Sequence, residues 1–222
     1  MNGLIVRNAT SADIPFLVET IIEAEKGGSD KFSYHTIFGL AEAEAAKLIG
    51  EMLAEEIDGC ELSISSFMVA EEEGQPAAAV GAWIEGMEGI SSTVLKGNLL
   101  NYVLPRACLE RAITLNIIVR DLHIECVRDA IQVGLVYVAP EFRGRNLVAL
   151  LIESQVERLM KVRPELTEMY VQVMGNNLAA ARTYEKVGFE VVMTKVSPHG
   201  QTTCYLPSNT RILMKKALSN QV

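Results

Sequence analysis

A short loop between a β-type run and a helical run carries the residues best suited to hold an anion. The apolar run Ile131 to Val138 leads to Pro140, and the loop Glu141-Phe142-Arg143-Gly144-Arg145-Asn146 opens a helix at Leu147. Several free backbone N–H groups and the positive end of the helix dipole then point at one place, a geometry that binds pyrophosphate. A plain structural connection has the same outline. Neither the nucleoside-triphosphate loop G-x-x-x-x-G-K-[ST] nor the dinucleotide fingerprint G-x-G-x-x-G occurs in the sequence.

A second segment combines a polar helix start with an aromatic hydroxyl. It reads Asn177-Leu178-Ala179-Ala180-Ala181-Arg182-Thr183-Tyr184-Glu185-Lys186-Val187-Gly188-Phe189. Asn177 suits the N-cap of a helix because its side-chain oxygen can accept a hydrogen bond from a free N–H of the first turn. Tyr184 could pack the helix against a sheet, with its hydroxyl bonded locally.

Together the two segments resemble the GNAT acyltransferase superfamily, whose members transfer an acyl group, usually acetyl, from coenzyme A to an amine. The run Val138 to Val148 is similar to the family's pyrophosphate loop, V-x-P-x-x-R-G-x-G-x-G/A, and Asn177 to Phe189 is similar to its N-x-x-A-x-x-x-Y-x-x-x-G-F helix. The opening Ile5 to Thr10, with Asp13, and the run Phe67 to Glu71 also resemble the family's start and its second strand. The resemblance covers nearly the whole chain except Gly86 to Asp129.

This resemblance implies the cofactor acetyl-CoA and an N-acetyltransferase reaction, in which the primary amine of a small molecule attacks directly in a ternary complex. It implies that the backbone near Val136 to Val138 polarises the acyl carbonyl, that Tyr184 is the general acid for the leaving thiolate, and that Asn177 bonds the cofactor arm. Arg143 and Arg145 are candidates for the phosphates, or ordinary surface arginines. The cofactor-binding residues expected are Val136, Tyr137, Val138, Arg143, Gly144, Arg145, Asn146, Leu147, Val148, Asn177, Ala180 and Tyr184.

Two residues of the loop depart from the family pattern. Asn146 stands where the family usually has glycine, and asparagine is the next most tolerant residue of left-handed backbone, so we expect it to keep the loop shape. Val148 stands where the family has glycine or alanine, and its branched side chain is expected to crowd the cofactor while its N–H stays available. A degenerate GNAT fold that binds acyl-CoA as a sensor or interaction module, without catalysis, is therefore the alternative function.

The general base is less clearly marked. The run Ile131 to Val138 carries no carboxylate, and the nearest candidates are Glu85, at the end of the preceding strand, and Glu125, just before the run. Either could equally be a surface residue. A chain of water molecules could remove the proton instead, and His123 is a further candidate, although a lone histidine is more often structural.

The elements that must position these residues follow from apolar periodicity. A strand at Leu4 to Arg7 precedes two amphipathic helices, and Phe67 to Glu71 with Ala77 to Glu85 form a hairpin. A helical insert is expected at about 86–129, with a first helix that ends at Pro105. The remaining order is strand, helix, strand, helix and two strands. We therefore predict a single domain over residues 1–222, of the α/β (α+β) class, with a mixed, mostly antiparallel twisted sheet of about seven strands flanked by helices.

Charge is distributed unevenly along the chain. The net charge is −8, with −11 in residues 1–75 and +3 in the remainder. Nucleic-acid binding is not expected, because it requires basic clusters that neutralise phosphates. The acidic first third favours a cationic amine as the acceptor, although Glu42, Glu44, Glu55 and Glu56 could equally form a solvated helix surface.

The sequence also bears on membrane association, metal binding and self-association. The apolar run Ala77 to Ile84 is far shorter than the roughly 18 residues of a membrane span, and Met1 to Thr10 has no signal-peptide pattern, so we expect no membrane association and a cytoplasmic protein. Four cysteines without C-x-x-C spacing and three histidines predict no metal site. Leu95, Leu99 and Tyr102 of the insert could belong to the core or to the interface of a homodimer.

Overall fold

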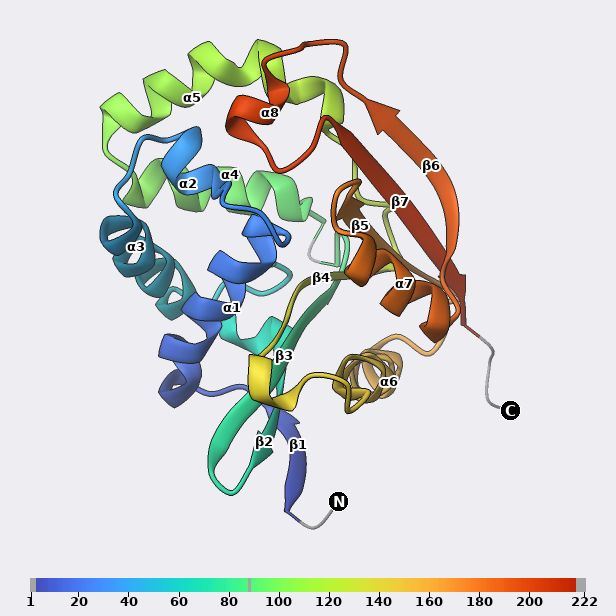
Figure 1. Ribbon diagram of the computed structural model, residues 1–222. Coiled ribbons are helices and arrows are strands. Elements are labelled where there is room, and N and C mark those ends of the chain that lie inside the picture. The colour runs from blue at the N-terminus through green and yellow to red at the C-terminus, as the bar shows by residue number, and fades with distance from the viewer. Residues whose placement is uncertain (1–2, 88, 219–222) are drawn as a thin grey trace.

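One seven-stranded sheet runs through the computed structural model, which describes residues 3–87 and 89–218 (Figure 1). The strand order is β1-β2-β3-β4-β5-β7-β6, and neighbouring strands are antiparallel except for β4 and β5. The predicted mixed, mostly antiparallel sheet is confirmed. The strands are β1 (Leu4–Asn8), β2 (Phe67–Glu72), β3 (Gln75–Ile84), β4 (Ile131–Val138), β5 (Glu168–Met174), β6 (Glu190–Val196) and β7 (Thr210–Ala217).

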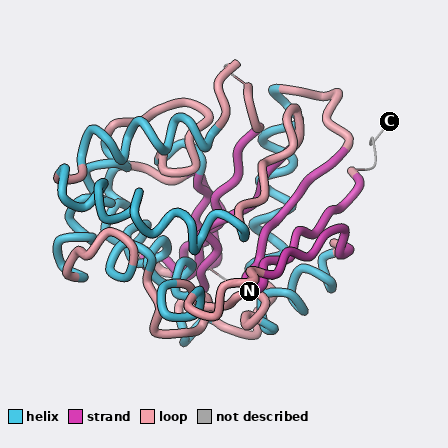
Figure 2. Tube along the Cα trace, turned by 90° about the horizontal axis from the view of Figure 1, so that it is seen from above, coloured by secondary structure: helices cyan, strands magenta, loops and turns pink. Residues whose placement is uncertain are grey.

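Helices cover both faces of the sheet, and the strands lie between the two groups of helices (Figure 2). On one face, α6 and α7 pack through Leu147, Leu151 and Tyr184 against alternate strand residues such as Ala70 and Val80. On the other face, α1, α3 and α4 pack against the intervening strand residues, such as Val69 and Ala79. The alternation follows from the two-residue period of a strand. The helices are α1 (Ile14–Lys26), α2 (Ser33–Thr36), α3 (Glu42–Ala54), α4 (Ser92–Val103), α5 (Arg106–Val119), α6 (Leu147–Val162), α7 (Leu178–Val187) and α8 (Thr202–Tyr205).

The helical insert expected at 86–129 consists of α4 and α5, which meet at Pro105 as the sequence indicated; residue 88 lies outside the described part. The short helices α2 and α8 were not predicted from the sequence. They contact each other, and the hydroxyl of Thr36 donates a hydrogen bond to the carbonyl of Tyr205 at 2.6 Å. No helix in the described part of the chain is long and apolar enough to cross a membrane. The single-domain organisation stays a prediction.

The sheet opens between β4 and β5. These parallel strands pair only from Ile131 to Val133, so the later part of β4 has no strand neighbour on that side. On its other side β4 contains a bulge: Gly134 pairs with Gly81 and Val136 pairs with Val80, which leaves Leu135 unpaired with a φ of 52°. A bulge adds one residue to a strand and increases its local twist. Backbone N–H and C=O groups of β4 therefore face a gap in the middle of the sheet.

A buried ion pair ties β1 to the start of α1. Asp13 is 4% exposed, and its carboxylate accepts hydrogen bonds from both terminal nitrogens of Arg7, at 2.7 and 2.8 Å. The backbone N–H of Thr10 donates to the same carboxylate at 2.8 Å. The hydrogen bonds from Arg7, with those from Thr10, lower the pKa of Asp13 below its ordinary value of 3.8.

We expect Asp13→Asn to lower the free energy of unfolding by about 2–3 kcal/mol at pH 7, because Arg7 and Thr10 lose a charged acceptor. Because the pKa of Asp13 is lowered on folding, its contribution is fully present above pH 3.8 and is lost as the pH falls through the folded-state value. Urea unfolding across this pH range measures the difference, with the exposed Asp58→Asn as control. Equal losses in the two variants, or a difference that persists at the lowest pH, would contradict this assignment.

Candidate active site

A cavity of about 850 Å³ lies where β4 and β5 separate. Residues from both faces of the sheet line it, including Tyr184 from the α6 and α7 face and Gln172 from the opposite face. All twelve residues expected to bind the cofactor line this one cavity. We call the wall formed by the loop before α6 and by α7 the α6 side. The wall that contains Glu25, Glu61, Lys96 and Arg211 is the α1 side.

The loop before α6 leaves backbone donors facing the cavity. It passes through a 3-10 turn at Pro140–Phe142, and Gly144 has a φ of 77°. Asn146 adopts the left-handed conformation expected from the sequence, with a φ of 60°. The first backbone hydrogen bond of the helix runs from Leu150 N–H to the carbonyl of Asn146. The N–H groups of Leu147 and Val148 therefore stand at the positive end of the helix dipole without a partner in the helix.

The two arginines of the loop have different roles in the structure. Arg145 donates to both carboxylate oxygens of Glu72 on β2, at 2.8 and 2.5 Å, and its guanidinium lies over the ring of Phe142. Its side chain thus fixes the loop to the sheet. Arg143 is exposed and lines the cavity, and its Nε donates to the carbonyl of Val138 at 3.2 Å. Its terminal nitrogens have no partner among the described residues. Arg143 is therefore the better placed of the two for a phosphate.

Tyr184 is 6% exposed on α7 and lines the cavity. Its ring packs edge-on against Phe189, with the ring centres 5.8 Å apart. Among the described residues no side chain or backbone group forms a hydrogen bond with its hydroxyl. Burial raises the pKa of Tyr184 above its ordinary value of 10.0, so the hydroxyl keeps its proton at neutral pH.

Asn177 caps α7 beside Tyr184. Its Oδ1 accepts a hydrogen bond from the N–H of Ala180 at 3.2 Å, which is the N-cap role that the sequence allowed. Its side-chain amide group is not used in this cap. The neighbouring Asn176 donates to the carbonyl of Gly27 at 3.3 Å, which joins the start of α7 to the end of α1 across the cavity.

The structure brings neither Glu85 nor Glu125 to the cavity wall. Glu85 is 2% exposed, and its carboxylate accepts hydrogen bonds from the Trp83 indole at 3.0 Å and from the Ser92 N–H and hydroxyl at 3.0 and 2.5 Å. This carboxylate holds the start of α4 against the end of β3. Glu125 is exposed to solvent, whereas His123 lies on the cavity wall.

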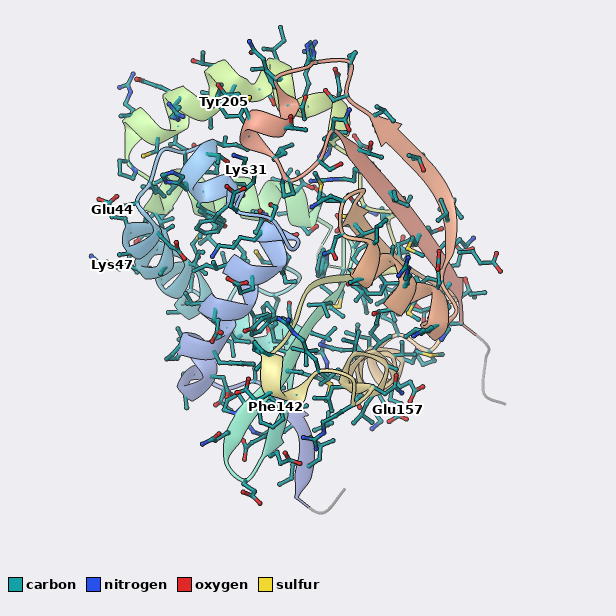
Figure 3. The ribbon with its side chains drawn as sticks, in the orientation of Figure 1. Lys31, Glu44, Lys47, Phe142, Glu157 and Tyr205 are labelled. Atoms are coloured by element: carbon teal, nitrogen blue, oxygen red, sulfur yellow. The ribbon has the colours of Figure 1, made fainter. Side chains whose placement is uncertain are left out.

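The carboxylates that do line the cavity were not singled out from the sequence. They are Glu23, Glu25 and Glu61, all from the acidic first third of the chain. Glu25 accepts a hydrogen bond from the Ser33 hydroxyl at 2.6 Å, Glu23 pairs with Lys26, and Glu61 pairs with Lys96. By contrast Glu42, Glu44, Glu55 and Glu56 are exposed and line no part of the cavity; Glu44 lies on the outer side of α3 (Figure 3).

Charge thus differs between the two walls. The α6 side carries Arg143, Arg145 and Lys186 and no carboxylate. The α1 side carries the carboxylates of Glu25 and Glu61 together with the cations Lys96 and Arg211, and Glu23 lies beside it. No group of three or more His, Cys, Asp or Glu side chains suited to a metal ion occurs in residues 3–87 and 89–218. The α6 side is therefore suited to an anionic ligand, whereas the α1 side offers both carboxylates and cations to a ligand.

Residues 41–189 match the model of the Acetyltransferase (GNAT) family. The chain belongs to this family. The fold agrees with solved structures at low sequence identity. An N-acetyltransferase from Staphylococcus aureus Mu50 superposes with a TM-score of 0.65 at 13% identity, covering 96% of this chain and 100% of that one. The apo form of an agmatine N-acetyltransferase mutant gives 0.55 at 17% identity, with 98% and 100% covered.

A third structure, of yncA from Salmonella typhimurium with its cofactor acetyl-CoA, has a TM-score of 0.52 at 14% identity and covers 100% of this chain and 97% of that one. No curated protein matches the sequence. GNAT proteins are acetyltransferases that use acetyl-CoA, and the site of this chain fits that molecule. Free N–H groups at the start of α6 suit its pyrophosphate, and the unpaired edge of β4 offers backbone partners to its amide-containing arm.

Val148 tests how closely this GNAT loop fits the cofactor. Its side chain is half-buried, lines the cavity and packs against the core beneath α6. We expect Val148→Ala to lower the Kd of acetyl-CoA by a factor of about three, because two methyl groups leave the cavity wall at the start of α6, while alanine preserves the helix. Calorimetric titration measures this, and an unchanged or raised Kd would show that the loop already accommodates valine.

Proposed function

We propose that the chain transfers the acetyl group of acetyl-CoA to the primary amine of a small molecule, and that the amine attacks directly in a ternary complex. The cavity at the β4 and β5 gap carries this proposal, because donors line its α6 side and carboxylates line its α1 side. An acetyl donor held at the first wall leaves the second free for an amine. Acetyl-CoA supplies an activated thioester carbonyl, and the protein supplies position, polarisation and proton transfer.

Backbone N–H groups on the unpaired edge of β4 polarise the acetyl carbonyl. Residues Val136 to Val138 lie beyond the last pair with β5, and the bulge at Leu135 turns this part of the strand relative to the preceding pairs. N–H groups fixed in a strand polarise a carbonyl without reorganising, which makes their electrostatic effect large. Tyr184 lines the same cavity from α7, and the raised pKa of its hydroxyl, which keeps its proton at neutral pH, supports its role as the acid that protonates the leaving thiolate.

A covalent enzyme intermediate is not part of this proposal. Cys126 is the cysteine on the cavity wall, and burial raises the pKa of its thiol to about 12. A thiol nucleophile acts as its thiolate, and a pKa in this range leaves almost none of it at neutral pH. Direct attack by the acceptor amine is the chemistry that remains consistent with the wall.

Acidic residues at the end of α1 would attract the acceptor amine into the cavity. A primary amine enters as an ammonium ion, and Glu23 and Glu25 attract it to the end of α1. It must then lose a proton, for which a water chain or His123 on the same cavity wall is available. Leu206 and Pro207, which follow α8, line the same cavity. The agmatine enzyme with the same fold acts on a small cationic amine by its name.

Two measurements on the purified protein test the proposed function. Calorimetric titration with acetyl-CoA reports the cofactor site, and release of free thiol from acetyl-CoA in the presence of small primary amines reports transfer. Binding together with amine-dependent thiol release supports the proposal. Binding without release for any amine would instead support a non-catalytic acyl-CoA-binding module. No binding up to millimolar acetyl-CoA would overturn both.

A further inference from the structure

Arg211 is a cation without a partner on the α1 side of the cavity. It is the second residue of β7, opposite Met174 of β5 and Lys195 of β6, and it is half-buried and lines the cavity. Among the described residues it forms no side-chain hydrogen bond and no ion pair within 4.0 Å. Burial lowers the pKa of its guanidinium, and the carboxylates of Glu25 and Glu61 act in the opposite direction from a greater distance.

Other desolvated cations of this protein are paired. Lys96, on the same wall, forms an ion pair with Glu61. Arg158 is also desolvated, and its guanidinium donates to Gln155 Oε1 at 2.9 and 2.6 Å and to the carbonyl of Ala82 at 3.1 Å. A guanidinium taken out of water without such acceptors costs stability. The position of Arg211 on a cavity wall is therefore best explained by an acceptor that arrives with a ligand.

The cofactor is not that ligand, because Arg211 faces the other side of the sheet. Along β7, Ile212 and Met214 pack on the face of α6 and α7. Leu213 packs on the opposite face, with Ile124 and Tyr170. Arg211 shares the face of Leu213, since strand residues two apart point the same way. The α6 loop and Tyr184 lie on the first face, so Arg211 belongs to the part of the cavity that the amine enters.

From this arrangement we infer that the acceptor is an amino carboxylate, with its ammonium drawn to Glu25 and its carboxylate held by Arg211. The inference rests on the proposed function and names its substrate class. Arginine offers two parallel N–H donors that match the two oxygens of a carboxylate. A doubly charged phosphate also matches arginine, but Glu25 and Glu61 would repel it more strongly than a carboxylate whose charge is balanced by its own ammonium.

Thiol release from acetyl-CoA tests the inference with matched amines. The probes are unbranched amino carboxylates from glycine to aminohexanoate, each compared with the alkylamine of the same length, and aminoethylphosphonate compared with β-alanine. We expect at least one amino carboxylate to exceed its alkylamine in kcat/KM by about tenfold or more, mainly through KM. Arg211→Met should abolish this preference, and Arg211→Lys should retain part of it. Arg106→Met, at an exposed position of α5 that does not line this cavity, should leave it unchanged.

The outcomes separate the two proposals. Alkylamines that react as fast as amino carboxylates, or a preference that survives in Arg211→Met, would overturn the inference and leave the acetyltransferase proposal standing. A higher kcat/KM for aminoethylphosphonate than for β-alanine would overturn the inference of a carboxylate and indicate that Arg211 binds a phosphate group. If no amine releases thiol, the proposed function fails, and calorimetric titration of the amino carboxylates into protein saturated with coenzyme A decides the anion site. Amino carboxylate binding that is present in the wild type and lost in Arg211→Met supports an anion site at Arg211. Absence of amino carboxylate binding to the wild type overturns it.

Discussion

Tyr184→Phe is expected to lower kcat by roughly 10²–10⁴-fold, the range in which a positioned general acid contributes. The variant keeps the ring that packs against Phe189 and removes only the hydroxyl, which makes no hydrogen bond to any described residue. Stability and the Kd of acetyl-CoA should therefore change little, by less than about threefold in Kd. Steady-state thiol release and calorimetric titration measure the two quantities side by side.

The pH dependence of the rate provides a second test of Tyr184. Because burial raises its pKa above 10.0, the acidic form persists through the neutral and mildly alkaline range. The rate of the wild type should not fall through loss of this proton below about pH 10. Tyr102→Phe is the matched control, since Tyr102 is 76% exposed on α4. An unchanged kcat in Tyr184→Phe would remove Tyr184 as the general acid.

Replacing Glu85 has a different expected result, a loss of stability with catalysis retained. Glu85→Ala leaves the Trp83 indole and both donors of Ser92 buried without an acceptor. Each such group costs about 1–3 kcal/mol, with partial relief by water, so we expect the free energy of unfolding to fall by about 3 kcal/mol. Glu85→Gln keeps the shape of the side chain and one acceptor oxygen. Its free energy of unfolding should therefore lie between those of Glu85→Ala and the wild type. Urea unfolding gives these values.

Kinetics of the same variants decide whether Glu85 or Glu125 acts as a base. Since neither carboxylate lines the cavity, Glu85→Gln and Glu125→Gln should both keep the limb of the pH–rate profile that rises toward alkaline pH. Because Glu125 is exposed, the Glu125→Gln variant should also have the free energy of unfolding of the wild type. Loss of the rising limb in either variant, at unchanged stability, would assign that residue to proton removal.

The cofactor side of the site could be predicted because its residues are close together in the sequence. The loop before α6 and the helix α7 are continuous segments, and glycine, asparagine and proline mark their turns by local backbone preferences. The strands and long helices follow likewise from apolar periodicity. Asn146 is left-handed as expected, and that expectation rested on asparagine standing where the resembled GNAT loop usually has glycine.

The other wall could not be predicted, because it is assembled from distant segments. Glu25, Glu61 and Arg211 come from the end of α1, the loop before β2 and the start of β7, and no spacing relates them. Leu135 gave no signal either, since leucine rarely adopts a positive φ and the bulge depends on pairing with β3. Glu85 was a candidate base by its place in the sequence, and only its contacts with Trp83 and Ser92 show its structural role.

The short parallel pairing between β4 and β5 separates the sheet into two parts that are weakly connected to each other. β1 to β4 form one block and β5 to β7 another, and each block is held by longer antiparallel pairing. Three residue pairs alone join the blocks within the described sheet. A ligand bonded to the free edge of β4 and to α7 bridges this short pairing, so occupancy reinforces the sheet at its weakest line and couples the rigidity of the two blocks.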